Sequence, residues 1–260
     1  MIKKDKFIKE IGWILKEKYG FARLAEFERD IQRLQKGEPV AYVIGFVDFL
    51  GCKIDLSFRP LIPRPETEFW AEKAIEDIKK SGRKKVRCLD IFAGSGCIGV
   101  AVLKHAPVAV VDFAEKEKKF LEQIKLNARL NNLSPKRRKF IQSDIFSNIS
   151  DDGGYDYIFA NPPYVAKRKN AVVQKSVLEW EPAGAIFGGR DGLFYIRKFL
   201  KEAEKHLSAG GKIYMEFDSR QKNEIAGILK RLGYGNVNFY KDQYGRWRYM
   251  MAEKQPLAGF

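Results

Sequence analysis

The residues best suited to chemistry in this chain are Asn161-Pro162-Pro163-Tyr164, which follow the apolar run Tyr157 to Ala160. That run has the length and composition of a buried strand, and the two prolines end it because neither can donate to a sheet ladder. Each proline fixes φ near about −65°, so the Asn161 amide and the Pro162 carbonyl are held on a stiff backbone beside the flat Tyr164 ring. This arrangement suits a planar group that carries an NH2, although Asn and Pro are also common in ordinary strand-to-loop turns.

A Gly-rich turn lies upstream, after a predicted strand at 86–91 and before a predicted helix. The turn consists of Phe92, Ala93, Gly94, Ser95 and Gly96. Its glycines permit the backbone to approach a ligand closely at the N-terminus of the helix. Phe92 stands where a dinucleotide-binding turn has its first glycine, and this disfavours a pyrophosphate site.

Acidic residues accompany three successive predicted strands: Asp90, Asp112 and Asp144. Asp112 is predicted to end the second strand, where a carboxylate would accept hydrogen bonds from a ribose diol. Asp144 would accept from the exocyclic amine of adenine, with Ile145 against the ring. Each Asp taken singly is also typical of a helix cap. Together they indicate a nucleoside ligand without a pyrophosphate, which S-adenosylmethionine fits.

Alternating strands and helices must position these groups. Strands are predicted at 86–91, 108–113, 139–143, 155–160 and 212–217, and helices at 96–104, 115–131, 193–207 and 221–232. This alternation predicts an α/β, Rossmann-like fold with a mostly parallel sheet and helices on both faces. Two more strands, 236–242 and 246–254, should form an antiparallel pair that completes a seven-stranded sheet at its edge.

The first 68 residues precede this unit and divide into two predicted segments. Residues 1–37 have apolar residues at helical spacing and form a short helical segment. Residues 38–68 contain a predicted β-hairpin at 40–56 and then an ordered, proline-rich stretch. That stretch is either a lid over a site or a rigid linker, and a helix begins after it at Glu66 or Thr67. The remainder, 69–260, is the main domain.

Composition narrows the class of protein. Lys and Arg number 48 against 33 Asp and Glu, so the net charge is +15, which favours polyanionic surroundings such as RNA or an acidic protein partner. Runs at 116–119 and 136–139 contribute much of this surplus, and such runs are equally typical of a solvated surface. The charged N-terminus and the absence of long apolar runs predict a cytoplasmic protein with no membrane contact.

Three cysteines, Cys52, Cys88 and Cys97, contain no CxxC pair, and His105 and His206 are the only histidines. This usage predicts neither a disulfide framework nor a metal site, and it argues against a His-based catalytic triad. The cysteines are expected to fill the core.

Several motifs occur together in an order that resembles the N(5)-glutamine methyltransferases that modify peptide chain release factors. The motifs are Gly37-Glu38-Pro39-Val40-Ala41-Tyr42, Ile62-Pro63-Arg64-Pro65-Glu66-Thr67-Glu68, Asp90 to Gly96, Asn161-Pro162-Pro163-Tyr164 and Glu181-Pro182. The resemblance runs from about Leu34 to Glu253. It departs from the family in Phe92, where glycine is commoner, and in a shorter helical N-terminal region.

The resemblance implies a class I methyltransferase domain at 69–260 that transfers methyl from S-adenosylmethionine to the glutamine of the GGQ motif in a release factor. The implied donor-binding residues are Thr67, Phe92, Ala93, Gly94, Ser95, Gly96, Asp112, Asp144, Ile145 and Asn161. The glutamine would bind at Asn161, Pro162, Pro163 and Tyr164, with Asn161, Pro162 and Tyr164 in the catalytic roles. Residues 1–37 would dock the substrate, residues 38–68 would form a linker or lid, and the protein is expected to be a monomer.

Two alternatives remain open from the sequence. An adenine amino-methyltransferase of RNA or DNA would present the same planar NH2 to Asn161 and Tyr164, and the charge of +15 supports it. The second alternative is a binding module that holds the donor without catalysis and docks on ribosomal RNA. A weak RNA contact through the basic surface is compatible with all three functions.

Overall fold

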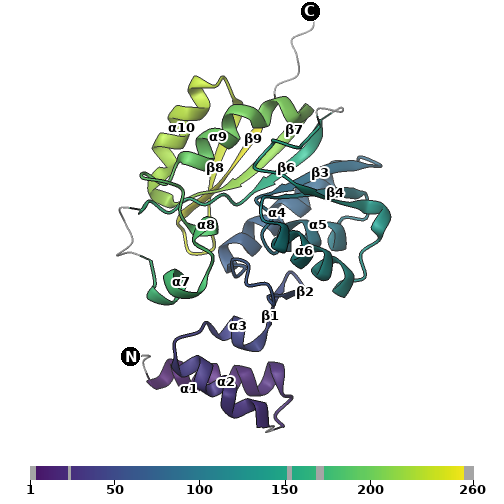
Figure 1. Cartoon of the computed structure of the whole chain (residues 1–260). Helices are drawn as coiled ribbons and strands as arrows, with labels where there is room; N and C mark the ends of the chain where they lie inside the picture. The colour runs from purple at the N-terminus through teal and green to yellow at the C-terminus, as the bar shows by residue number, and fades with distance from the viewer. Residues whose placement is uncertain (1–3, 23–24, 151–153, 168–172, 255–260) are drawn as a thin grey trace, which may run out of the picture.

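The computed structural model of the chain describes residues 4–22, 25–150, 154–167 and 173–254. Its centre is a seven-stranded sheet in the order β5-β4-β3-β6-β7-β9-β8 (Figure 1). The strands are β3 (Val86–Ile91), β4 (Ala109–Glu115), β5 (Arg138–Gln142), β6 (Tyr155–Ala160), β7 (Leu207–Glu216), β8 (Gly235–Lys241) and β9 (Trp247–Glu253). β3 to β7 pair in parallel, and β9 is antiparallel to both of its neighbours. The predicted Rossmann-like, mostly parallel sheet is confirmed.

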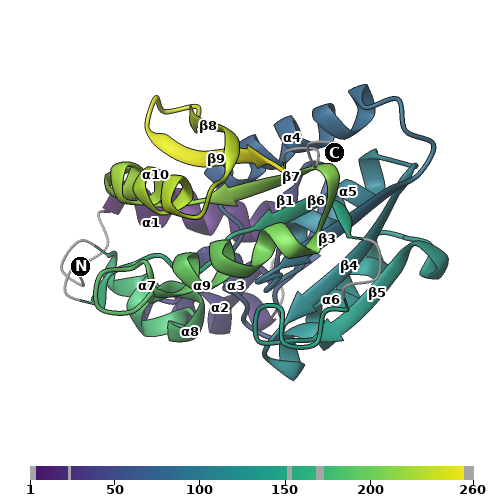
Figure 2. The ribbon, with the colours of Figure 1, turned by 90° about the horizontal axis from the view of Figure 1, so that it is seen from above.

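Helices cover both faces of the sheet (Figure 2). They are α4 (Pro65–Lys80), α5 (Cys97–His105) and α6 (Lys118–Leu130) on one face, and α9 (Phe194–Ala203) and α10 (Lys222–Arg231) on the other. β6 shows how the sequence specifies this layering. Tyr157 and Phe159 belong to the first core, whereas Ile158 and Ala160 belong to the second, because side chains alternate between the faces of a strand.

Two features of the sheet and its connections differ from the sequence-based predictions. The prediction that strand 108–113 ends beside Asp112 is wrong, because β4 continues to Glu115 through pairing with both neighbours. The last two strands form the predicted antiparallel pair at one edge of the sheet, with β9 between β7 and β8. The second difference is a pair of short helices that the sequence did not predict, α7 (Lys175–Trp180) and α8 (Ala183–Ile186). Both are shorter than two turns, too short for a clear helical period.

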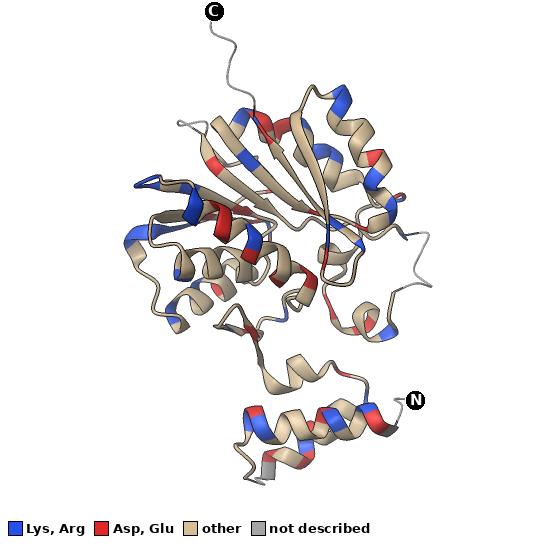
Figure 3. Ribbon diagram, turned by 180° about the vertical axis from the view of Figure 1, so that it is seen from behind, with Lys and Arg blue, Asp and Glu red and all other residues tan. Residues whose placement is uncertain are grey.

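A helical unit precedes the sheet and lies beside it in Figure 1. It comprises α1 (Lys4–Trp13), the π-helical turn η1 (Ile14–Lys18), α2 (Ala25–Gln35) and α3 (Val40–Ile44). Acidic and basic residues are intermixed along α1 and α2 (Figure 3). The predicted hairpin at 40–56 is shorter than expected, because Pro39 opens α3 and only β1 (Phe46–Phe49) and β2 (Cys52–Asp55) pair. Within the described ranges, the chain has no helix with the length and apolar character needed to cross a membrane.

Glu38 ties the helical unit to the rest of the chain. Its buried carboxylate accepts two hydrogen bonds from Arg33 in α2, at 2.9 and 2.7 Å, and one from Arg59 at 2.6 Å. These guanidinium groups hold the pKa of Glu38 below its usual range although burial acts in the opposite direction. The Gly37-Glu38-Pro39 motif therefore has a structural role at the junction between segments.

Side-chain amides of α6 hold the β1–β2 hairpin against the main domain. Asn131 pairs with both backbone groups of Lys53, and Asn127 pairs with both backbone groups of Asp55, at 2.8 to 3.2 Å. The two asparagines therefore replace the missing neighbour of an edge strand, whose open backbone groups would otherwise need water. Asn127 also donates to the carbonyl of Ser95 at 2.9 Å, which connects the hairpin to the Gly-rich turn.

Asn127→Ala is expected to lower the free energy of unfolding by about 2 kcal/mol, since the half-buried backbone groups of Asp55 and the buried carbonyl of Ser95 lose their partner. Urea titration followed by circular dichroism would measure this loss. Asn223→Ala, at an exposed site on α10, is the matched control and should change stability by less than about 0.5 kcal/mol. Equal stability of the two variants would contradict a structural role for Asn127.

Candidate active site

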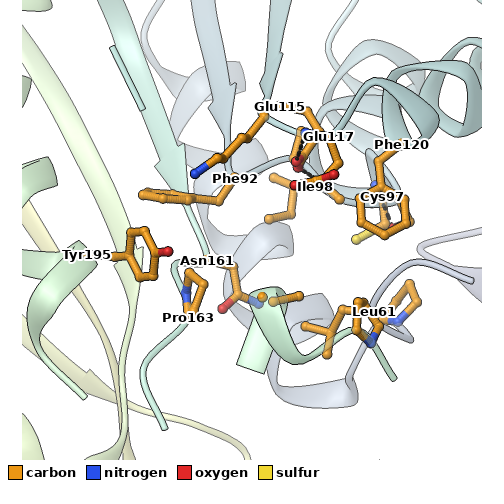
Figure 4. Close-up of a pocket in the computed structure, with 18 of the residues that line it drawn as sticks. Leu61, Phe92, Cys97, Ile98, Glu115, Glu117, Phe120, Asn161, Pro163 and Tyr195 are labelled. Atoms are coloured by element: carbon orange, nitrogen blue, oxygen red, sulfur yellow. Dashed lines mark hydrogen bonds between the residues drawn. The ribbon is translucent and has the colours of Figure 1, made fainter. Parts of the chain in front are cut away.

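A cavity of about 310 Å³ opens at the carboxyl ends of the parallel strands. Figure 4 shows Phe92 and Tyr195 on one side, Leu61, Cys97 and Phe120 on the other, and Asn161 with Pro163 between them. The lining comes from the Gly-rich turn, the ends of β4 and β5, the Asn161 loop, and two segments that close the opposite side, 61–64 and 182–185. This is the position at which open parallel sheets bind ligands.

The Gly-rich turn lies at the strand end as predicted, and Phe92, Ala93, Gly94 and Ser95 line the cavity. Phe92 has a φ of +58°, a left-handed conformation that costs a non-glycine residue about 1 to 2 kcal/mol. Edge-on contacts with Tyr195 and Phe199 offset this strain. Gly96 has a φ of +76° and caps α5, and a Cβ there would lie 2.8 Å from Ile124, so its role is to let the turn pack on α6.

The acidic side chain at the end of β4 is Glu115, not Asp112. Glu115 lines the cavity and accepts hydrogen bonds from the backbone N–H groups of Gly94 and Glu117, both at 2.9 Å. Burial raises the pKa of Glu115. Asp112 lies mid-strand, where it accepts a hydrogen bond from the Tyr155 hydroxyl at 2.9 Å, and it is not among the described residues that line the cavity. The two-residue extension of β4 is the reason for the difference.

Asp144 and Ile145 lie at the rim of the cavity, beside the end of β5. Asp144 accepts a hydrogen bond from Lys116 at 3.1 Å and remains partly exposed. Ile145 has a φ of +57° and is buried against the second core, so its backbone is held in one place. The structure therefore brings Asp144, Ile145 and Glu115 to one cavity, whereas Asp90 and Asp112, the other two acids that the sequence singled out, are not among the described residues that line it.

The Asn161 loop contributes Asn161 and Pro163 to the lining. The Asn161 amide nitrogen donates to the Thr67 hydroxyl at 3.3 Å. Pro162 is buried behind them. Tyr164 faces an adjacent surface depression instead of this cavity, with its hydroxyl bonded to Glu216 at 3.0 Å.

Glu181 connects the two segments that close the cavity opposite the sheet. Its buried carboxylate accepts hydrogen bonds from the Ile62 N–H at 3.0 Å and from Arg64 at 2.6 Å. The proline-rich stretch is therefore part of the cavity wall, bound to the segment that follows α7. Arg64 and Glu181, 117 positions apart in sequence, account for two of the motifs that the sequence singled out.

Asp90 lies beneath the cavity, fully buried, with one oxygen bonded to the Gly99 N–H at 2.9 Å and the other without a hydrogen-bond partner in the described ranges. Burial raises the pKa of Asp90 to about 8, so the carboxyl is neutral at pH 7. In the unfolded chain an Asp loses its proton near pH 3.9. The free energy of unfolding therefore falls as pH rises from about 4 to 8, by up to about 1.4 kcal/mol per pH unit.

Asp90→Asn is expected to remove this pH dependence. The free energy of unfolding of the variant relative to the parent should rise by up to about 1.4 kcal/mol for each pH unit between pH 5 and 7. Urea titrations at three pH values would measure it. Glu224→Gln, on the exposed face of α10, is the control and should leave the parent's dependence unchanged. Parallel stability curves for Asp90→Asn and the parent would show that Asp90 is ionised in the folded protein.

The remaining polar candidates have structural explanations. The three cysteines are buried, and burial raises the pKa of Cys97 and Cys88 above the usual range, so their thiols are unreactive near neutral pH. In the basic run at 136–139, Arg137 donates to four backbone carbonyls that belong to or flank the end of α5 and the start of β4. Within the described residues, no group of three or more His, Cys, Asp or Glu side chains is placed to hold a metal ion.

Solved structures of low sequence identity share this fold. The catalytic domain of hMettl16, solved with an RNA hairpin, has a TM-score of 0.61 at 18% identity, covering 79% of this chain and 76% of that chain. A 16S rRNA methyltransferase from T. thermophilus, solved with AdoMet and guanosine, has a TM-score of 0.59 at 18% identity, covering 81% of this chain and 50% of that one. They establish the methyltransferase fold.

Sequence comparison is more specific. The methyltransferase small domain family matches residues 73–181. Release factor glutamine methyltransferase of Thermodesulfovibrio yellowstonii is 35% identical over 86% of this chain and 79% of its own length. The enzyme of the same name from Flavobacterium psychrophilum is 33% identical over 87% and 79%. Similarity of this extent, together with a cavity at the strand ends beside Asn161, shows that the chain belongs to the release factor glutamine methyltransferase family.

Proposed function

We propose that the protein transfers a methyl group from S-adenosylmethionine to the side-chain amide nitrogen of the glutamine in the GGQ motif of a peptide chain release factor. The observation that carries this proposal is the position of Asn161, at the end of β6 and in the wall of the cavity beside the Gly-rich turn. A donor site and an acceptor for a planar NH2 therefore share one enclosed space.

The residues of the cavity suit a nucleoside with a short polar chain. Glu115 accepts from two backbone N–H groups, so it keeps lone pairs for a ribose diol. Asp144 and Ile145 supply an acceptor and an apolar surface for a base. Phe92, Ala93, Gly94 and Ser95 hold the remainder of the donor. When bound, the donor supplies a methyl group already activated on a sulfonium.

The acceptor residues orient a poor nucleophile. The lone pair of an amide nitrogen is delocalised into its carbonyl, so the nitrogen must be held in one orientation. The Asn161 oxygen and the Pro162 carbonyl each accept one N–H of the glutamine, which directs the lone pair toward the methyl group and weakens amide resonance. Orientation of this kind contributes up to about 7 to 11 kcal/mol to a barrier. Pro163 completes the substrate site in the cavity wall, and Tyr164, which lines the adjacent depression and bonds Glu216, holds the end of the loop.

In this proposal residues 1–37 dock the release factor. Residues 38–68 form the wall that joins this segment to the methyltransferase domain at 69–260. Exposed apolar side chains on the unit, Ile8, Trp13 and Phe21, support a protein contact there. The protein works as a monomer in the cytoplasm, where release factors act.

Adenine in RNA is the second candidate substrate, and the net charge of +15 favours it. Much of the run at 136–139 is committed to the fold, since Arg137 bonds backbone carbonyls and Arg138 lies over the Phe140 ring. What remains of the basic surface supports a weak RNA contact.

Transfer of labelled methyl from S-adenosylmethionine would test the proposal, with a purified release factor, its variant with alanine for the GGQ glutamine, and total RNA as acceptors. Label on the factor that disappears in the alanine variant is the expected result. Label on RNA alone would overturn the proposal in favour of the adenine reaction.

A further inference from the structure

A buried carboxylate lies directly behind Asn161. Glu216 ends β7, the neighbour of β6, and is 1% exposed. One of its oxygens accepts from the Thr67 hydroxyl at 2.6 Å and from the Trp70 indole N–H at 2.8 Å. The other accepts from the Tyr164 hydroxyl at 3.0 Å. Burial raises the pKa of Glu216, which the three donors and the positive charge of Arg248 oppose.

The direction of each hydrogen bond in this group is determined by chemistry. The amide nitrogen of Asn161 carries only donors, so across 3.3 Å it donates to the Thr67 oxygen. The single hydroxyl hydrogen of Thr67 then points to Glu216. If the Asn161 amide were rotated by about 180°, its oxygen would face the lone pairs of the Thr67 hydroxyl, whose hydrogen is already donated to Glu216. The two oxygens would then repel each other.

We infer that Glu216 and Thr67 are positioning residues that select one of the two orientations of the Asn161 amide, the one with its oxygen free for the substrate. The inference rests on the proposed function. The selected orientation presents an acceptor to the substrate NH2, whereas the opposite one would present two donors to it. Neither Glu216 nor Thr67 needs to contact the reacting nitrogen.

The second oxygen of Glu216 fixes Tyr164 in the same way. The Tyr164 hydroxyl donates to this oxygen, and burial raises the pKa of Tyr164 well above its usual value. Tyr164 is therefore a neutral donor to Glu216 and does not serve as a base. One carboxylate thus positions both the first and the last residue of the Asn-Pro-Pro-Tyr motif.

Thr67→Val and Thr67→Ser form the decisive pair of variants. Valine has the shape of threonine without the hydroxyl, and is expected to lower kcat for methyl transfer by about tenfold or more, the effect of one net hydrogen bond. The dissociation constant of S-adenosylmethionine, measured by calorimetry, should stay within about threefold, because the Thr67 hydroxyl is already engaged with Glu216 and Asn161. Serine restores the hydroxyl and should recover kcat to within about threefold of the parent.

Glu216 is tested with Glu216→Gln and Glu216→Leu. The glutamine oxygen can still accept from Thr67 and Trp70 while its NH2 donates to the Tyr164 oxygen, so kcat should stay within about fivefold of the parent. Leucine should lower kcat at least as much as Thr67→Val. Because both act through one chain of hydrogen bonds, adding Thr67→Val to Glu216→Leu should lower kcat by less than about threefold more. If Glu216→Leu does not fold, the Thr67 pair decides.

Three results would overturn the inference: kcat unchanged in Thr67→Val, a weaker donor affinity at constant kcat, or a serine variant as slow as the valine one. The second would mean that Thr67 serves the donor, as the resemblance to the family implies. Failure of the proposed function is a separate outcome, since the parent itself would then leave the release factor unmethylated. If the parent methylates RNA, the same comparison of variants is made with RNA, because Asn161 would receive an N–H in either case.

Discussion

Asn161→Ala is expected to lower kcat for methylation of the release factor by about 100- to 1000-fold, the range found when one preorganised hydrogen-bonding group is removed from an active site. The end of β6, the two prolines that follow and the hydrogen bond to Thr67 hold the Asn161 side chain in position. Alanine removes the acceptor for the glutamine N–H and leaves the nitrogen free to turn its lone pair away from the methyl group.

The measurement is the initial rate of labelled methyl transfer at saturating donor, with donor affinity determined separately by calorimetry. Asn238→Ala, at an exposed position of β8, is the control and should match the parent. A rate within tenfold of the parent, with donor binding unchanged, would show that Asn161 is not the acceptor that orients the substrate.

The sequence specified the fold well because its signals are local. Strand 155–160 has an apolar run ended by two prolines, and its observed bounds are Tyr155–Ala160. The helix α4 begins at Pro65, within two residues of the prediction, because proline suits the first helical position. The Gly-rich turn has its glycines where φ is positive, at Gly94 and Gly96.

What the sequence missed depends on contacts between distant segments. Glu216 and Asn127 lie 149 and 72 positions from partners that give them their roles. A lone Glu at the end of an apolar strand resembles any other strand-end acid, and an Asn in a helix resembles a surface residue. The sequence did indicate the longer β4, because the apolar residue Ala114 stands before Glu115 and extends the strand. The sequence-based prediction placed the end of β4 two residues too early and therefore took Asp112 for the strand-end acid.

The difference between Glu115 and Asp112 can be tested with a variant at each position. Glu115→Ala is expected to weaken binding of S-adenosylmethionine by about 100-fold, since charge-assisted hydrogen bonds to a diol contribute roughly 1.5 to 3 kcal/mol each. The loss includes the support that Glu115 gives to the Gly94 N–H. Asp112→Asn should leave donor affinity within about twofold, because Asp112 bonds the Tyr155 hydroxyl and asparagine retains an acceptor there.

Calorimetric titration with S-adenosylmethionine and with an analogue that lacks the ribose hydroxyls separates the two effects of Glu115. The parent should discriminate strongly against the analogue, whereas Glu115→Ala should bind donor and analogue about equally, because the carboxylate that distinguishes them is gone. If Glu115→Ala still prefers the natural donor, the diol is bound elsewhere and Glu115 only shapes the turn. A loss of affinity in Asp112→Asn alone would restore the assignment made from the sequence and would require β4 to end earlier when the donor is bound.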